Sequence, residues 1–293
     1  MTASGSAHPT PAAGWRPRDE DLDFFGLSHQ GLVRKKNEDH FLYSTLHKTM
    51  RVGGTNLPNP ELLELPSQRL ASFAMVADGV GGRAGGDAAS RAAVETIARY
   101  ATDAMQCLLN SDVQDEAAML GALAAGAAAS HQAVVSQAAE GGGGSATTLT
   151  AVMVVWPVLY VLQVGDSRCY RYRDGVLTQL TRDQTMAQEL VDSGVLKPEV
   201  APQTRFAHVL SSSIGGQVTN PVVFKEVRQP HDVTLLCSDG LTKHVSDAQI
   251  AARLASMESS EQVCRTLVDD ALAGGGSDNV TVVVLRAVVP SSK

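Results

Sequence analysis

Residues 73–82 read FAMVADGVGG. The apolar run Phe73–Ala77 predicts a buried strand that ends in the carboxylate of Asp78. A glycine cluster follows at once and leaves the backbone free to turn, and an alanine-rich helix is predicted to begin at Asp87. A carboxylate at the end of a buried strand, beside backbone of this kind, is suited to binding a hard cation. The alternative is a tight strand-to-helix turn in which Asp78 is only a local cap.

The same glycines also match the dinucleotide fingerprint G-x-G-x-x-A, from Gly79 to Ala84. The match lies between a strand and a helix, as that motif requires. Asp78 directly precedes the first glycine, however, and its charge would repel a pyrophosphate unless a cation lay between them. No clear βαβ unit surrounds the motif, so the sequence disfavours dinucleotide binding.

The composition describes a chain that can build a full core, with 293 residues, 44% of them hydrophobic, and a formal net charge of −7. That charge argues against a nucleic-acid partner bound by simple electrostatics. No apolar run approaches membrane-spanning length, and the N-terminus lacks the apolar segment of a secretory signal. The four cysteines have no close pair spacing, which is typical of a reduced cytosolic protein. We therefore expect a cytoplasmic protein with no membrane and no nucleic-acid partner.

Hydrophobic periodicity and turn signals predict an order of strands, two helices, many strands, two helices and a last strand. The predicted strands are Leu22–Gln30, Phe41–Tyr43, Arg69–Ala77, Ala146–Val155, Val158–Val164, Cys169–Arg173, Val176–Leu180, Val222–Val227, Asp232–Cys237 and Val280–Val288. The predicted helices are Asp87–Leu109, Gln114–Ala139, Met186–Ser193, Asp247–Ala255 and Ser260–Ala273. This order favours α+β layering, in which antiparallel sheet is covered by helices.

The connections complete the predicted organisation. The segment Leu46–Ser67 is interpreted as a loop or loose hairpin, and Gly141–Gly144 as a flexible break. Asp174-Gly175 is a strong hairpin signal, so the middle of the chain is predicted to be an antiparallel meander. Residues 1–21 lack periodicity and are predicted to be a disordered lead to one domain over residues 22–290.

Further carboxylates adjoin other predicted strand ends. Asp239 follows one strand directly, Asp278 precedes the last strand, Asp166 follows another, and Glu38 with Asp39 begins a further one. Any one of them alone is more often a turn residue. Strand ends of one sheet can meet at one edge, and carboxylates clustered there repel one another unless cations neutralise them.

Oxygen ligands of this kind favour Mg²⁺ or Mn²⁺ over zinc. Two such ions close together can bind phosphate oxygens and turn a bridging water into a hydroxide nucleophile. Arg34, five residues before Asp39, is placed to hold a phosphate with its forked guanidinium. The alternative for the neighbouring Lys35 and Lys36 is a solvated basic turn.

Six short motifs in this order resemble the metal-dependent serine/threonine protein phosphatases of the PPM, or PP2C-like, family in its compact bacterial form. They are Arg34–Asp39, Asp78–Gly82, Ser145–Leu149, Val164–Arg168, Ser238–Leu241 and Ser277–Thr281. The resemblance covers about Leu22 to Val288. It implies a four-layer αββα sandwich, with two central antiparallel β-sheets flanked by helix pairs, and a mobile flap over about 183–210.

The resemblance also implies roles for individual residues. Asp78 would bridge two Mn²⁺ or Mg²⁺ ions, with the carbonyl of Gly79 as a further ligand. Asp239 and Asp278 would hold the first ion, and either Glu38 or Asp39 would hold the second, directly or through water. Asp166 with Asp239 would form a weaker third metal site. Arg34 would bind the substrate phosphate, and Asn279 would support these ligands.

Two positions depart from the family pattern. Many eukaryotic members have a histidine, a proposed general acid, where this chain has Val80. Valine cannot donate a proton, but bacterial relatives usually have an apolar residue there too. The usual Asp-His-Ser at the start of the flap reads Asp183-Gln184-Thr185. These differences leave the source of the leaving-group proton open.

The resemblance implies hydrolysis of phosphoserine and phosphothreonine on proteins, without a phosphoenzyme. The expected partners are phosphorylated proteins, which are substrates of a Ser/Thr kinase, and the expected state is a monomer. Two alternatives stay open. The chain is a dedicated phosphatase of one regulatory switch protein, or it is an inactive module that binds phosphoproteins. The complete set Asp78, Asp239 and Asp278 argues against the inactive module.

Overall fold

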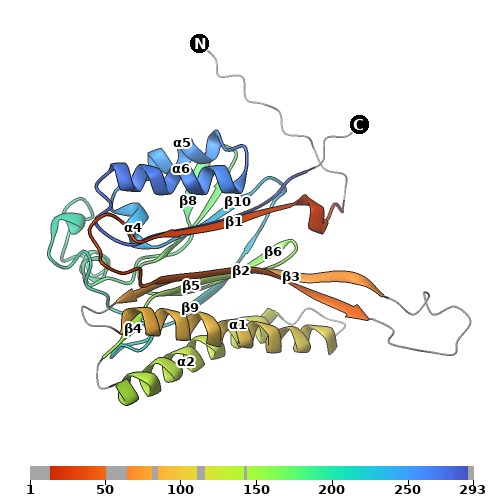
Figure 1. The fold of residues 1–293 in the computed structure, drawn as a ribbon, viewed down its shortest axis with the longest axis horizontal. Coiled ribbons are helices and arrows are strands. Elements are labelled where there is room, and N and C mark those ends of the chain that lie inside the picture. Colours follow the sequence, from red (N-terminus) through yellow and green to blue (C-terminus); the bar gives the residue numbers. More distant parts are fainter. Residues whose placement is uncertain (1–13, 51–64, 81–84, 111–115, 142–143, 290–293) are drawn as a thin grey trace, which may run out of the picture.

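The computed structural model describes residues 14–50, 65–80, 85–110, 116–141 and 144–289 (Figure 1). Two antiparallel sheets face each other at its centre. The five-stranded sheet has the order β1 (Leu22–His29), β11 (Val280–Ala287), β10 (Val233–Cys237), β7 (Arg168–Arg173) and β8 (Val176–Gln179). The six-stranded sheet has the order β2 (Asp39–Met50), β3 (Leu65–Val80), β5 (Leu149–Val155), β6 (Val158–Val164) and β9 (Val222–Val227), and β4 (Ala146–Thr147) pairs with β3.

A helix pair covers the outer face of each sheet. Helices α1 (Gly86–Asn110) and α2 (Glu116–Gly141) lie on the six-stranded sheet, and α5 (Asp247–Ala255) and α6 (Ser260–Ala273) lie on the other (Figure 1). The short helices α3 (Met186–Asp192), η3 (Ala201–Gln203) and α4 (Asp239–Thr242) lie in loops at one end of the sheets. The predicted four-layer αββα sandwich is therefore confirmed.

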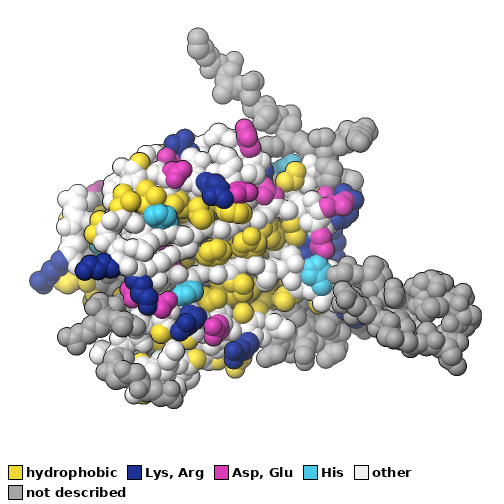
Figure 2. All heavy atoms as spheres, viewed as in Figure 1, with side chains coloured by type: hydrophobic (Ala, Val, Ile, Leu, Met, Phe, Trp, Pro, Cys, Tyr) yellow, Lys and Arg dark blue, Asp and Glu magenta, His cyan; other side chains and the backbone are white. Residues whose placement is uncertain are grey.

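Strand β3 is largely apolar from Leu70 to Ala77 because both of its faces are covered there. Phe73 and Met75 point to α1 and α2, whereas Ala74 and Val76 point into the space between the sheets. Since side chains alternate along a strand, this register places Asp78 on the face between the sheets as well. Figure 2 shows hydrophobic side chains gathered between the layers, with charged side chains around them.

The predicted meander in the middle of the chain is wrong. β5 pairs with β6, and β7 pairs with β8, but β6 lies in the six-stranded sheet and β7 in the five-stranded one. The chain changes sheets at Gly165, whose φ of 100° is open to glycine and strained for other residues. The hairpin turn at Asp174-Gly175 is confirmed, with φ values of 50° and 82°.

Three predicted boundaries also change. β2 runs on to Met50 and β3 begins at Leu65, so the predicted loop over Leu46–Ser67 holds strand at both ends, and residues 51–64 lie outside the described residues. The end of β3 includes Asp78, because Gly79 and Val80 pair with β4. Of the predicted flexible break Gly141–Gly144, residues 142–143 also lie outside the described residues.

The predicted disordered lead is ordered in its last part. Residues 14–21 pack on the sandwich, where Trp15 meets Trp156 edge to face and Asp21 is buried in the short helix η1 (Asp19–Asp21). Residues 1–13 lie outside the described part of the chain.

Helix α2 is an exception to the expectation that no segment is long and apolar enough to cross a membrane. Its Glu116–Ala139 stretch passes that test by length and composition, with a mean hydropathy of 1.3. Alanine dominates the stretch, and Met119, Leu123 and Ala127 are buried in the core beneath it. The core helix of a soluble protein passes the same test, so this is weak evidence for a membrane span.

Candidate metal centre

Asp39 and Asp78 face each other across β2 and β3. The two residues are direct partners in the strand register, and like charges in that position destabilise a sheet. Burial, followed by the charge of Asp39, raises the pKa of Asp78 well above its ordinary value. Burial also raises the pKa of Asp39 to about 6. The pair is therefore costly to ionise unless a cation lies beside it.

Asp39 is anchored from the opposite sheet. Its Oδ2 accepts hydrogen bonds from the Ser238 hydroxyl at 2.8 Å and the Thr281 hydroxyl at 2.7 Å. Its Oδ1 is buried and has no hydrogen-bond partner among the described residues. These bonds join the ends of β2, β10 and β11, which fixes the distance between the two sheets at this point.

Asp239 and Asp278 approach the same place from the five-stranded sheet. Asp239 begins α4 directly after β10, and Asp278 precedes β11. The ammonium of Lys243 lies between them, with Nζ 2.6 Å from Oδ2 of each carboxylate. Arg34 reaches Asp278 from the β1–β2 loop, with 2.7 Å from Nε to Oδ1 and 2.8 Å from Nη2 to Oδ2.

These cations reverse the effect of burial on Asp278. Burial acts to raise its pKa, but hydrogen bonds from Lys243 and Arg34 outweigh that effect and lower it. Asp239 keeps a second oxygen, Oδ1, that is buried and without a hydrogen-bond partner among the described residues. Lys243 and Arg34 thus already pair with the carboxylates of Asp239 and Asp278, but Oδ1 of Asp239 stays unpaired.

Asp166 enters from the turn after β6. Gly165 places it there because a side chain at Gly165 would lie 2.7 Å from Thr148. The side chain of Asp166 is buried, and burial followed by the charge of Asp239 raises its pKa to about 8.

Backbone contacts hold the remaining predicted residues. The Gly79 amide donates to the Glu38 carbonyl at 3.2 Å, and a side chain at Gly79 would lie 2.4 Å from the Gly86 carbonyl oxygen. Only glycine allows so close an approach of β3 to the start of α1. Asn279 accepts from the Glu38 amide at 2.9 Å and donates to the carbonyls of Gln30 and Lys36, so it fixes the loop that carries Arg34.

One cavity of about 230 Å³ brings nearly all of these residues together. Its lining includes Arg34, Glu38, Asp78, Gly79, Asp166, Asp239, Asp278 and Asn279 from the predicted set, together with Val80. Asp39 lies behind this lining. A second cavity of about 650 Å³ continues from Asp166 and Asp239 beneath the segment 183–210.

The donor set fits Mg²⁺ or Mn²⁺, because it consists of carboxylate and carbonyl oxygens and includes two orphaned buried ones. In the described part of the chain, no three acidic, histidine or cysteine side chains lie close enough together to hold one ion as they stand. Lys243 and Arg34 bind the carboxylates instead. An ion that binds Oδ2 of Asp239 or the oxygens of Asp278 would therefore compete with these two side chains.

The metal-free protein is expected to lose stability as the pH rises from about 4 to about 8. The raised pKa values of Asp39, Asp78 and Asp166 mean that the folded chain binds more protons than the unfolded chain in this window, so the free energy of unfolding falls with rising pH. Asp278, with its lowered pKa, acts in the opposite direction below about pH 4. Thermal unfolding in EDTA measures the trend, and a melting temperature that rises steadily to pH 8 would contradict it.

A model of the protein phosphatase 2C family matches residues 64–274. The chain belongs to the protein phosphatase 2C family. The matched residues include Asp78, Asp166 and Asp239, whereas Arg34, Glu38, Asp39 and Asp278 lie outside the match and owe their placement to the geometry above.

Named relatives within the phosphatase 2C family are bacterial. The serine/threonine protein phosphatase PstP of Mycobacterium tuberculosis is 36% identical over 267 residues, which are 91% of this chain and 45% of PstP. The crystal structure of the M. tuberculosis phosphatase PstP/Ppp superposes with a TM-score of 0.71 and 31% identity, covering 92% of this chain and 99% of that one. A PstP catalytic domain in complex with 2 manganese ions gives a TM-score of 0.67 and 32% identity, covering 92% and 99%. This chain thus spans less than half the length of the curated relative.

Two residues of this phosphatase 2C site escape sequence reasoning. Lys243 stands four residues after Asp239, a spacing that usually indicates only a helix salt bridge, and its second contact, with Asp278, depends on the fold. His208 lines both cavities, with Nδ1 3.9 Å from Oδ2 of Asp239. A single histidine in a polar loop carries no signal that would have singled it out.

Proposed function

We propose that this chain is a metal-dependent protein serine/threonine phosphatase, with its single domain over residues 22–290. The observation that carries the proposal is the meeting of Asp78, Asp239, Asp278 and Arg34 at one cavity of a phosphatase 2C fold. The bacterial relatives named above are serine/threonine phosphatases, and one was solved with manganese. Phosphorylated proteins are the proposed substrates.

The carboxylates divide between two metal positions. Asp78 would bind both ions, with the Gly79 carbonyl as a further ligand. Asp239 and Asp278 would hold the first ion, and Glu38 or Asp39 would hold the second, directly or through water. Asp166 and Asp239 would offer a weaker third position. When bound, the ions would activate water for attack and bind oxygens of the phosphate.

Arg34 is the proposed phosphate-binding residue. Its side chain is about half exposed, with a relative accessibility of 52%, and its fork already binds the planar carboxylate of Asp278. A phosphate presents the same pair of oxygens to a guanidinium. Val80 borders the cavity but has no proton to give to the leaving alkoxide, so that proton comes from another group.

Metal removal tests the proposed function. Phosphate release from a phosphothreonine peptide should require Mn²⁺ or Mg²⁺, stop in excess EDTA, and return when Mn²⁺ is added beyond the chelator. Full activity in EDTA would contradict the metal assignment. A folded, metal-loaded protein that binds the peptide without releasing phosphate would support the inactive-module alternative instead.

Arg34→Ala is expected to raise KM more than it lowers kcat. Loss of a charge-assisted contact to phosphate removes roughly 1–3 kcal/mol, or about fivefold to 150-fold in KM. Kinetics at saturating Mn²⁺ separate this effect from any change in metal binding. Lys35→Ala, next to it in the same loop, is the matched control, and an unchanged KM in Arg34→Ala would remove Arg34 from the substrate site.

A further inference from the structure

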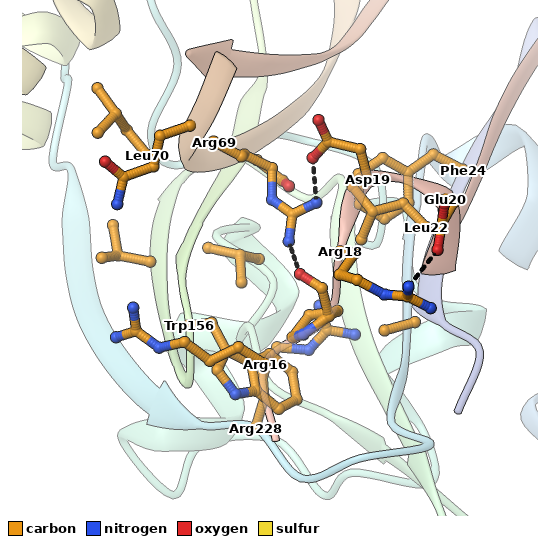
Figure 3. Close-up of a pocket in the computed structure, with 16 residues that line it drawn as sticks. Arg16, Arg18, Asp19, Glu20, Leu22, Phe24, Arg69, Leu70, Trp156 and Arg228 are labelled. Atoms are coloured by element: carbon orange, nitrogen blue, oxygen red, sulfur yellow. Dashed lines mark hydrogen bonds and ion pairs between the residues drawn. The ribbon is translucent and has the colours of Figure 1, made fainter. Parts of the chain in front are cut away.

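A third cavity, separate from the two described above, lies at the opposite end of the sandwich. It measures about 610 Å³ and is lined by residues of both sheets, among them Phe24 of β1, Ser72 of β3 and Val154 of β5 (Figure 3). Along β3, Ser72 is six residues before Asp78, which is about 20 Å at the rise of a strand. This cavity is therefore distinct from the candidate metal centre, and none of the roles proposed above involves it.

Arg228, directly after β9, supplies a buried charge to this cavity. Its side chain is only 6% exposed, and Nη2 donates to the carbonyls of Asp232 at 2.8 Å and Leu285 at 3.3 Å. Its Nε has no hydrogen-bond partner among the described residues. The carboxylate of Asp232, whose charge acts on Arg228, is already bound by Arg173 at 2.6 Å through both oxygens. Asp232 is therefore shared as a counter-ion between Arg173 and Arg228. A buried cation that is only partly compensated is unfavourable, and an entering anion would relieve that cost.

The other charges around the cavity are mostly paired with one another. Arg69 binds Asp19 at 2.7 Å and also the Pro17 carbonyl, and Arg18 binds Glu20 (Figure 3). Arg18 also pairs with Asp21. Arg16 is exposed and has no ion pair with any described residue. Two guanidinium groups, those of Arg16 and Arg228, are thus left to bind something else, in a chain whose net charge is −7.

The cavity also has an aromatic wall. Trp156 lines the cavity together with Arg16 and Arg228 (Figure 3), and Trp15 packs edge-on against its indole with ring centroids 5.4 Å apart. Leu22 and Phe24 add apolar surface. A ligand here would meet a cationic end and a flat apolar side.

We propose that this cavity binds a small molecule that carries a phosphate or carboxylate group. The anionic group binds the part of the Arg228 guanidinium that lines the cavity, with Arg16 as a second cation, and the less polar part of the molecule lies against Trp156. Guanidinium groups bind both kinds of anion in a bidentate way, so the two anions share one chemistry.

Tryptophan fluorescence gives this cavity its own readout. The chain has 2 tryptophans, Trp15 and Trp156, and both lie here. Metal-free protein in EDTA is titrated with inorganic phosphate or with citrate at constant ionic strength, against sodium chloride. We expect a saturable change in emission with one or both anions, and the comparison of the two separates a phosphate site from a carboxylate site. Because no metal is present, the result does not depend on the proposed phosphatase activity.

Variants assign the signal to the two arginines. Arg16→Ala should weaken binding at least about fivefold, Arg228→Gln should abolish it, and Arg265→Ala, an exposed arginine paired with Glu261, should leave it unchanged. If Arg228→Gln does not fold, Arg16→Glu replaces it and should abolish binding. No saturable change with either anion, or equal affinity in the wild type, Arg16→Ala and Arg16→Glu, would overturn the proposal.

Discussion

Asp239→Asn is expected to lower the rate of phosphate release at least about a hundredfold at any practical Mn²⁺ concentration. Asparagine keeps the size of the side chain but removes the charge that Lys243 and a metal ion would share. Substitutions that only touch the neighbours of metal ligands already cost 10–100-fold in affinity or activity, so loss of a ligand charge should cost at least as much.

The matched control is Asp270→Asn. Asp270 lies on α6, away from the cavity, and its carboxylate pairs with Arg253 of α5. It should keep full activity. Circular dichroism and thermal unfolding establish that both variants fold, and calorimetry measures Mn²⁺ binding. A folded Asp239→Asn protein with normal activity would remove Asp239 from the metal centre.

Lys243→Met is expected to bind Mn²⁺ about tenfold to a hundredfold more tightly than the wild type. The ammonium makes two short contacts, each 2.6 Å, with oxygens that an ion needs. Each contact is a charge-assisted hydrogen bond worth roughly 1.5–3 kcal/mol, part of which is recovered when the ion takes its place. Methionine has a similar length and no charge, so it removes the competitor without leaving a large void.

The same substitution should destabilise the metal-free protein, because Asp239 and Asp278 would then repel each other without a cation between them. Calorimetry with Mn²⁺ and thermal unfolding in EDTA give two readouts that do not depend on catalysis. Lys36→Met is the control, since Lys36 pairs with Asp87 at the surface. Unchanged or weaker Mn²⁺ binding in Lys243→Met would show that Lys243 does not compete with the ion.

Local signals account for most of what the sequence could predict. An apolar run followed by Asp and Gly marks Asp78 and Asp239, and the continuous apolar stretch of β11 indicates a strand covered on both faces. Boundaries were less secure where strand residues are polar, as in Leu46–Met50 of β2. The change of sheet at Gly165 depends on which surface β7 packs against, and no local pattern encodes that.

The residues that sequence reasoning missed act through partners distant in the chain. Lys243 matters because Asp278, 35 residues later, completes its second contact. Arg228 matters because the carboxylate of Asp232 binds Arg173, whereas Arg228 bonds only to the carbonyl of Asp232. The spacing of residues in the sequence predicts neither pairing. Both pairings form only when the fold places β7, β10 and β11 side by side.

The position of Lys243 bears on how the protein would respond to manganese supply in a cell. A competing ammonium that is part of the chain would occupy the site to the same extent at every protein concentration. It multiplies the half-saturating manganese level by a constant factor, set by the fraction of molecules in which the lysine has swung away. If Lys243→Met confirms this competition, the wild-type protein would bind manganese only at a higher free-ion concentration than its carboxylates alone would need.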